Sequence, residues 1–143
     1  MSRSEDALEQ IIYISTARAM PSETLLDSIL ESSRRNNRRD GLSGLLVVGG
    51  RRFLQVLEGP EAQCGATYAR IRADERHFAL VQLSRRTIGE RSFAGWDMGL
   101  EQGYGASLAS VVADLTQRVA DPYLQAQFRG FAEMHSTAAR VPA

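Results

Sequence analysis

Lysine is absent from this sequence: all 17 basic residues are arginine. A cofactor or substrate therefore cannot be held through a lysine Schiff base, which excludes pyridoxal phosphate and retinal chemistry. Cysteine is nearly absent as well, and the single residue, Cys64, cannot form a disulfide within the chain. Because this cysteine and only two histidines form no recognisable zinc or iron spacing, we expect no metal site.

Long apolar runs and an excess of either charge are also missing. No stretch approaches the roughly 18 apolar residues of a transmembrane helix, and the amino terminus has no basic region followed by such a stretch. We therefore expect a soluble, cytoplasmic protein without a membrane partner. The 17 acidic residues balance the 17 basic ones, which argues against nucleic acid as the main partner. A length of 143 residues favours one domain with a single core.

The spacing of apolar residues predicts a mixed α+β chain. We expect strands over residues 10–15, 42–48, 53–59, 79–83 and 96–100, and helices from 22 into the arginine-rich run 34–39 and over 60–73. In the last strand Trp96, Met98 and Leu100 alternate with Asp97 and Gly99, so the tryptophan and the methionine should share a face. This order of elements predicts a ferredoxin-like α+β sandwich, with a five-stranded sheet and two helices on one face.

The C-terminal segment should form helices on or near the other face of the sheet. Its first apolar stripe has helical spacing and consists of Leu108, Val111, Val112, Leu115 and Val119. A second helix should begin at Asp121–Pro122. We expect a sensor domain over residues 8–102, a helical cap or output segment over 103–135, and a disordered tail over 136–143. The cap either covers this sheet or pairs with another subunit.

A glutamine interrupts the apolar run of residues 53–59. Gln55 lies on the same predicted face as Phe53 and Leu57, and a buried amide left without partners costs about 1 to 3 kcal/mol. A polar side chain or a ligand should therefore face Gln55 inside the fold. Tyr13 raises the same question within the first apolar strand.

Each conspicuous residue also has an ordinary structural interpretation when it is taken singly. Tyr13, Trp96 and Met98 are residue types common in protein cores. Asn37, expected just past the first helix, is a common terminator, and Gln55 could bridge two strands. Only the combination of these residues points to a specific function.

In order and spacing, these residues resemble the BLUF family of blue-light sensors that bind FAD, over about residues 8–100. The matching segments are Ile12–Ser15, Asn36–Gly44, Phe53–Gly59, Asp74–His77 and Phe93–Met98. The resemblance implies a flavin ring between the two helices of the sandwich. Its polar edge would be bonded by the amides of Asn37 and Gln55, with Tyr13 hydrogen-bonded to Gln55. Ile29 and Ile71 would contact its flat faces, and the alanine stripe at positions 62, 66, 69 and 73 would leave room.

The resemblance suggests further cofactor contacts around this ring. Ser33 lies on the same face of the first helix as Ile29, and Asn36 occupies the position next to the pyrimidine edge of the ring. Arg38 and Arg76 are candidates for contacts with the dinucleotide phosphates. His77 fits the family pattern near the cofactor, although a histidine in a turn is more often a bystander.

The implied mechanism is photochemical, and the protein is expected not to be an enzyme. Blue light turns the flavin into an oxidant toward Tyr13, an electron and a proton leave the phenol and return, and Gln55 rotates or tautomerises into a new hydrogen-bond arrangement. The strand with Trp96 and Met98 would pass this change to the C-terminal helices. With no output domain expected in the chain, the signal should reach an unidentified partner protein, and a homo-oligomer is expected.

Two other functions fit the same architecture. An acylphosphatase-like hydrolase would need an arginine in a glycine-rich loop after the first strand, but Thr16–Ala19 contains Arg18 and no glycine. An RNA- or protein-binding module would expose aromatic residues on its central strands beside basic ones. Phe53, which follows Arg51 and Arg52, matches that pattern only in part.

Overall fold

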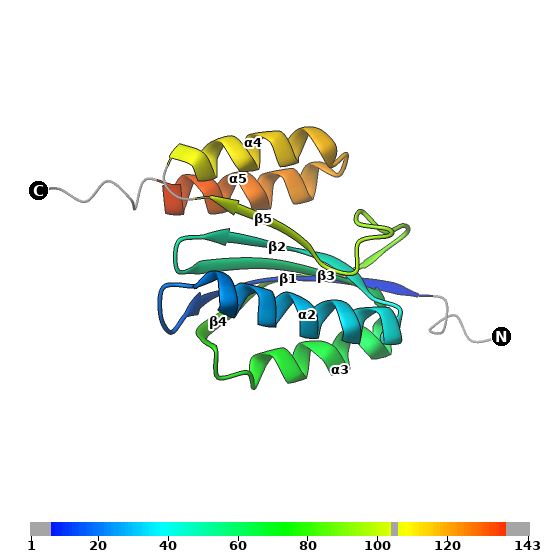
Figure 1. Ribbon diagram of the computed structural model, residues 1–143. Coiled ribbons are helices and arrows are strands. Elements are labelled where there is room, and N and C mark those ends of the chain that lie inside the picture. The colour runs from blue at the N-terminus through cyan, green and yellow to red at the C-terminus, as the bar shows by residue number, and fades with distance from the viewer. Residues whose placement is uncertain (1–6, 104–105, 137–143) are drawn as a thin grey trace, which may run out of the picture.

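The computed structural model describes residues 7–103 and 106–136, which form one sheet with helices on both sides (Figure 1). The strands are β1 (Leu8–Ala17), β2 (Ser43–Gly49), β3 (Arg52–Pro60), β4 (His77–Ile88) and β5 (Gly99–Gly103). The helices are α2 (Glu23–Asp40), α3 (Glu61–Arg72), α4 (Ala106–Arg118) and α5 (Pro122–Ser136). The tail expected over residues 136–143 lies outside the described residues, except for Ser136 at the end of α5.

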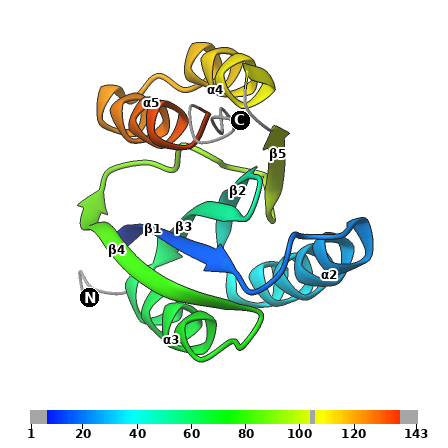
Figure 2. The same cartoon turned by 90° about the vertical axis from the view of Figure 1, so that its left-hand side faces the viewer.

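The sheet has the strand order β4-β1-β3-β2-β5, in which β2 and β5 are parallel and the other neighbours are antiparallel. Helices α2 and α3 cover one face, and α4 and α5 lie over the other, as the view in Figure 2 shows. The predicted ferredoxin-like sandwich with a five-stranded sheet is therefore confirmed. The register of the central strands places Tyr13 of β1 directly opposite Gln55 of β3.

Local signals in the sequence set both ends of α2. The hydroxyl of Ser22 accepts a hydrogen bond from the backbone N–H of Leu25 at 3.0 Å, as an N-cap residue should. Gly41 ends the helix with φ 72°, a left-handed conformation that glycine adopts without steric strain. The helix therefore includes the whole arginine-rich run, and Asn37 lies inside the helix rather than just past it.

The prediction of a strand over residues 96–100 is wrong in its first half. Strand β5 begins only at Gly99, so Trp96 and Met98 lie in the loop before it. The N–H of Trp96 donates to the carbonyl of Phe93 at 3.0 Å, and Gly95 has φ 84°, so the chain makes a turn here instead of extending. Consequently the two side chains do not share a face: Met98 is 2% exposed, whereas Trp96 is 36% exposed.

The stripe of small residues on α3 also differs from the expectation. Ala62, Ala66, Ala69 and Ala73 are all exposed to solvent, so they leave no room for a ligand inside the fold. The helix instead buries the face that contains Tyr68. Burying an aromatic ring removes far more apolar surface from water than burying methyl groups, which explains why this face turns inward.

The core is divided by the sheet into two sides. On the side of α4 and α5, the buried apolar residues of the two helices and of the turn between them are Leu108, Val112, Leu115, Val119, Leu124, Phe128, Phe131 and Ala132. The helices thus cover this sheet, which is one of the two arrangements that the sequence left open. Along β3, Leu54 and Val56 face that side, while Phe53 and Leu57 face α2 and α3. Gln55 therefore also points toward α2 and α3.

Among the described helices, none has the length and apolar character needed to cross a membrane.

Candidate functional site

A cavity opens between α2, α3 and the sheet, on the face opposite α4 and α5. Its volume of about 170 Å³ is more than ten times the roughly 10 to 15 Å³ that one water molecule needs. The lining residues are Ile29, Ser32, Ser33, Asn36 and Asn37 of α2, Leu46, Phe53 and Gln55 of the sheet, and Thr67, Arg70, Ile71, Asp74, Arg76 and His77 from α3 to the start of β4. Both polar and apolar side chains therefore line one space that is large enough for a small molecule.

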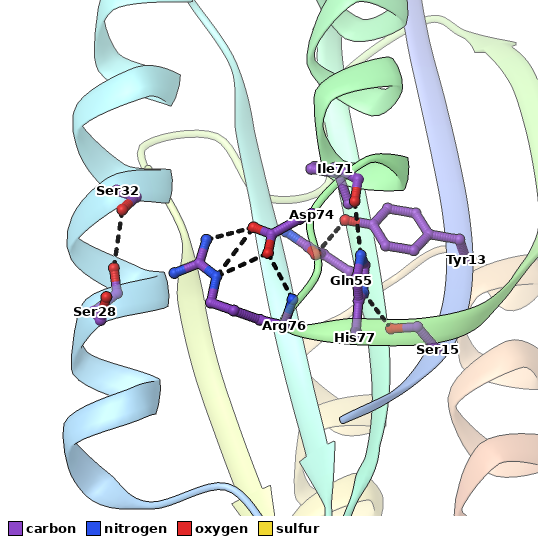
Figure 3. A network of polar contacts seen from close by, with 9 residues as sticks. All are labelled: Tyr13, Ser15, Ser28, Ser32, Gln55, Ile71, Asp74, Arg76 and His77. Carbon is purple, nitrogen blue, oxygen red and sulfur yellow. Dashed lines mark hydrogen bonds and ion pairs between the residues drawn. The ribbon is translucent and has the colours of Figure 1, made fainter. Parts of the chain in front are cut away.

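The amide of Gln55 faces this cavity with its oxygen already engaged. The hydroxyl of Tyr13 donates a hydrogen bond to Oε1 of Gln55 (Figure 3). On the other side, Nε2 of Gln55 lies 3.7 Å from the sulfur of Met98, which is a weak acceptor. Within the described part of the chain, this thioether is the only acceptor that Nε2 reaches. The amide therefore retains hydrogen-bonding capacity for a ligand.

Tyr13 is completely buried behind Gln55 and does not itself line the cavity. Its ring packs against that of Tyr68, with the centroids 5.3 Å apart. Burial raises the pKa of Tyr13 well above its ordinary value, and the nearby Tyr68 and Asp74 raise it further. The phenol is therefore protonated at neutral pH, and it acts as the donor that Gln55 requires.

The turn between α3 and β4 forms an ordered edge of the cavity (Figure 3). Both the backbone N–H and Nε of Arg76 donate to Asp74 at 2.9 Å, and these bonds to Arg76 lower the pKa of the Asp74 carboxyl. His77 contacts the carbonyl of Ile71 through Nε2 at 2.7 Å and the hydroxyl of Ser15 through Nδ1 at 2.8 Å. Since a carbonyl only accepts, Nε2 of His77 carries a proton.

Most of the cofactor-binding residues predicted from the sequence converge on this cavity. Those that line it are Ile29, Ser33, Asn36, Asn37, Gln55, Ile71, Arg76 and His77. Arg38 does not line it, because its largely exposed side chain points to Asp97, with Nε and Oδ2 3.7 Å apart. Asn37 donates its amide N–H to the carbonyl of Asp97, which leaves its side-chain oxygen available to the cavity.

The side chains of Met98 and Trp96, both in the loop before β5, pack against different neighbours. Met98 lies inside against Gln55, as described above, whereas the indole of Trp96 lies over the start of β5. This close approach requires Gly99, because a Cβ there would lie 2.4 Å from the indole ring. The indole also packs against Phe93, with the centroids 5.6 Å apart, and against the guanidinium of Arg118 in α4 at 6.0 Å. Trp96 thus contacts α4 through Arg118, and Met98 contacts the side-chain amide of Gln55.

Thr67 and Arg70 also line the cavity from α3, although neither was among the residues predicted from the sequence. Together with Ile71 they occupy positions i, i+3 and i+4 of one face of α3, and Asp74 follows in the turn after the helix. That spacing, counted from Ile71, is the signal by which they could have been found.

The chain matches the model of the BLUF family, described as sensors of blue-light using FAD, over residues 8–99. The blue light- and temperature-regulated antirepressor BluF of Escherichia coli is 33% identical over 100 residues, which cover 66% of this chain and 25% of that protein. Subunit beta of the photoactivated adenylate cyclase of Euglena longa is 32% identical over 95 residues, or 66% of this chain and 11% of that protein. The matches thus span a quarter or less of these relatives.

Solved structures show the same fold. The dark-state structure of the BLUF protein BlrB has a TM-score of 0.69 at 28% identity and covers 94% of this chain and 97% of its own. The structure of Klebsiella pneumoniae BlrP1 with FMN and cyclic diGMP has a TM-score of 0.73 at 26% identity and covers 93% of this chain and 36% of its own. Since the family model spans every residue that lines the cavity, this chain belongs to the BLUF family of blue-light sensors.

Proposed function

We propose that this protein binds a flavin in the cavity between α2 and α3 and reports blue light by rearranging the hydrogen bonds of Gln55. The observation that carries the proposal is the buried pair of Tyr13 and Gln55, whose amide faces that cavity. In this proposal the protein is a sensor and not an enzyme, since light changes the bonding of its own side chains and no substrate is converted.

The donor set around the cavity suits a flavin. The polar edge of an isoalloxazine alternates acceptors with one imide donor, and an amide side chain offers both functions without a charge. Asn36, Asn37 and Gln55 supply such amides. Ile29 of α2 and Ile71 of α3 would supply apolar contacts to the two flat faces of the ring.

Two arginines at the cavity support a flavin that carries phosphate groups. Arg70 and Arg76 both line it, and a guanidinium binds phosphate oxygens through paired N–H donors. We propose FAD, which the family description names, although the BlrP1 structure contains FMN. Arg38 stays a proposed phosphate contact for the more distant part of the dinucleotide, because it lies on the outer surface of α2.

The residues of the chain can carry out the switching step. When bound, the flavin supplies the absorption of blue light and an excited, oxidised ring that accepts an electron. Tyr13 is placed to give up that electron, and a phenol that has lost an electron releases its proton readily. The proton has an acceptor in Oε1 of Gln55. Because both particles return to Tyr13 afterwards, the lasting change is the rotation or tautomerisation of Gln55.

The signal would leave the site through the loop before β5. Met98 contacts the amide of Gln55, and Trp96 contacts Arg118 of α4, so a movement of this loop reaches the C-terminal helices. We propose that a partner protein reads this movement. The relatives named an antirepressor and a photoactivated adenylate cyclase indicate the kinds of output that BLUF domains serve.

We also propose that the protein forms a homo-oligomer. Strand β4 is an edge strand of the sheet, and it exposes Phe78, Val81 and Leu83 to solvent. An exposed apolar edge strand is prone to pair with another chain. A cytoplasmic location stays a prediction from the sequence.

Neither alternative function is favoured by the positions of its key residues. Arg18 donates to the carbonyl of Glu75 at 2.8 Å, so it already has a structural partner after β1. Phe53 is 5% exposed and packs under α2, where it cannot stack on RNA bases.

The test is a visible absorption spectrum of the purified protein, reconstituted with FAD and measured before and after blue illumination. We expect a yellow protein whose flavin bands shift slightly to the red and return in the dark. Free FAD at the same concentration is the control for bleaching. A protein that stays colourless after reconstitution, or a bound flavin without a reversible shift, contradicts the proposal.

A further inference from the structure

A second polar side chain is buried on β3, three positions beyond Gln55 and on the opposite face of the sheet. Glu58 is fully buried, as is its neighbour Gln10 on β1. Burying a carboxyl group is costly unless hydrogen bonds compensate for the loss of water. The hydrogen-bond partners of Glu58 therefore show which parts of the fold this buried side chain holds together.

Four donors surround the carboxylate of Glu58. Its Oε1 accepts from the backbone N–H of Phe93 at 2.6 Å and from the hydroxyl of Ser43 at 3.2 Å. Its Oε2 accepts from the backbone N–H of Ser92 at 3.1 Å and from Nε2 of Gln10 at 3.3 Å. Each of the two oxygens thus accepts two hydrogen bonds. A carboxylate can accept all four, whereas an amide side chain has only one acceptor oxygen.

Two of these donors belong to the loop that carries Trp96 and Met98. The backbone amides of Ser92 and Phe93 lie at the start of this loop, so Glu58 fastens its first part to β3. Its last part is held separately, because the carbonyl of Trp96 accepts from the N–H of Gly44 at 3.0 Å. The loop is thus anchored at both ends, and the carbonyl of Met98 itself accepts from Nε of Arg34 at 2.9 Å.

The same carboxylate is connected to the beginning of α5. While Nε2 of Gln10 donates to Glu58, its Oε1 accepts from Nε of Arg86 at 3.1 Å. Arg86 in turn pairs with Asp121 and lies over the ring of Tyr123, 4.4 Å from its centroid. Because Asp121 also accepts from the N–H of Tyr123 at 2.9 Å, this chain of contacts ends in the first turn of α5.

We propose that Glu58 is a positioning residue of the light sensor, which holds the loop of residues 91–98 against Gln55 and connects that loop to α5 through Gln10 and Arg86. The part of this inference that concerns light rests on the proposed function. A rearrangement at Gln55 that displaces Met98 strains the anchored loop, and Glu58 passes the strain to the C-terminal helices.

The first test replaces Glu58 by glutamine, which has nearly the same size. One acceptor oxygen becomes an NH₂ group that meets two donors, so the clamp on the loop is broken. We expect the dark-state hydrogen exchange of the Ser92 and Phe93 amides to become about tenfold faster or more. The matched control is Glu90→Gln, an exposed glutamate just before the same loop, which should leave these rates unchanged. Unchanged exchange in Glu58→Gln overturns the proposal.

A spectroscopic measurement separates positioning from mere stability. With flavin bound, we expect Glu58→Gln to recover from illumination about tenfold faster than the wild type, because a loosened loop lowers the barrier for Gln55 to turn back. Wild-type recovery in a variant with a loosened loop overturns the positioning role. If the wild type shows no light-induced shift, the proposed function fails, whereas the exchange rates still decide whether Glu58 clamps the loop.

Two further measurements keep the inference testable if Glu58→Gln does not fold. In the wild type, the amides of Ser92 and Phe93 should exchange about a hundredfold more slowly than those of an unstructured peptide, and unprotected amides overturn the clamp. Arg86→Met should leave the flavin shift intact and raise the dark-state exchange in the first turn of α5 about tenfold. An unchanged rate there overturns the connection to α5.

Discussion

The amide of Gln55 lies between a strong hydrogen-bond partner and a weak one. The Tyr13 hydroxyl donates to its oxygen, and the sulfur of Met98 is the only acceptor, within the described residues, that its nitrogen reaches. An amide flipped by half a turn would instead present its N–H groups to Tyr13 and its oxygen to Met98. A ligand with both donors and acceptors can compensate for either orientation, so the difference in free energy between the two states can be small enough for a switch.

Replacing Gln55 by leucine tests this role directly. Leucine fills a similar volume, but it has neither an N–H nor a carbonyl to relocate. We expect the variant to bind flavin and to lose the light-induced red shift in its difference absorption spectrum. The control is Gln63→Leu, which changes an exposed glutamine on α3. A full shift in Gln55→Leu would show that the switch lies elsewhere.

A second prediction concerns Tyr13 and the stability of the protein at alkaline pH. Burial raises the pKa of Tyr13 in the folded protein, while the unfolded chain releases this proton near pH 10. Above about pH 10 the folded state therefore binds more protons than the unfolded state, and the free energy of unfolding falls by up to ~1.4 kcal/mol per pH unit from this group. In urea unfolding at increasing alkaline pH, Tyr13→Phe should lose stability less steeply than the wild type. Tyr123→Phe, at an exposed ring, is the control; equal slopes for all three proteins would refute the prediction.

At the scale of elements, the end of α2 shapes the site. Asn36 and Asn37 face the cavity from the last turns of this helix, and Gly41 then turns the chain into β2. That strand brings the N–H of Gly44 to the carbonyl of Trp96. One helix end thus positions the amides that face a ligand and, through the next strand, the loop that would respond to it.

Gly41→Ala should therefore destabilise the protein. No atom lies within 4 Å of a Cβ at this position, so the cost comes from the left-handed backbone with φ 72° and should be about 1 to 2 kcal/mol. The control is Gly89→Ala, which also has open space around its Cβ and no left-handed φ. Urea unfolding should show a loss in the first variant and none in the second. Equal effects would show that the left-handed backbone at Gly41 does not decide the cost, since both positions have open space around a Cβ.

At the scale of the whole molecule, the C-terminal helices are part of the core. Phe128 of α5 is fully buried, and its ring lies 6.4 Å from that of Phe93 in the loop before β5. The cavity lies on the other face of the sheet. A change in the loop can therefore reach the cap through packing as well as through Glu58.

Phe128→Ala should lower the free energy of unfolding by about 3 to 5 kcal/mol, the usual cost of removing a buried ring. Met134→Ala on the same helix changes a side chain that is 67% exposed, so it should cost less than about 0.5 kcal/mol. Chemical unfolding monitored by circular dichroism measures both. A small loss in Phe128→Ala would show that the cap is only loosely attached.

Much of the fold and of the site was predictable, because it depends on local patterns. Alternation along β3 placed Gln55 on a buried face, and Ser22 marked the start of α2. The positions of Trp96 and Met98 were not predictable in the same way. Their alternation suggested a strand, but a turn stabilised by contacts with distant residues takes its place. The alanines of α3 were likewise expected to face the cofactor, but they are exposed. The helix buries the face with Tyr68 instead, because this ring removes more apolar surface from water than the alanine methyl groups would.

The sequence by itself determined the order of the elements, the presence of a neutral amide and a phenol in the core, and the exclusion of lysine-bound cofactors. These properties follow from residue type and from spacing over a few positions. Only the tertiary structure decided that Met98 lies inside and Trp96 outside, that Arg38 lies away from the cavity, and that Glu58 binds the loop before β5. Each of these depends on contacts between segments that are far apart in the chain, and spacing along a single strand or helix carries no information about such contacts.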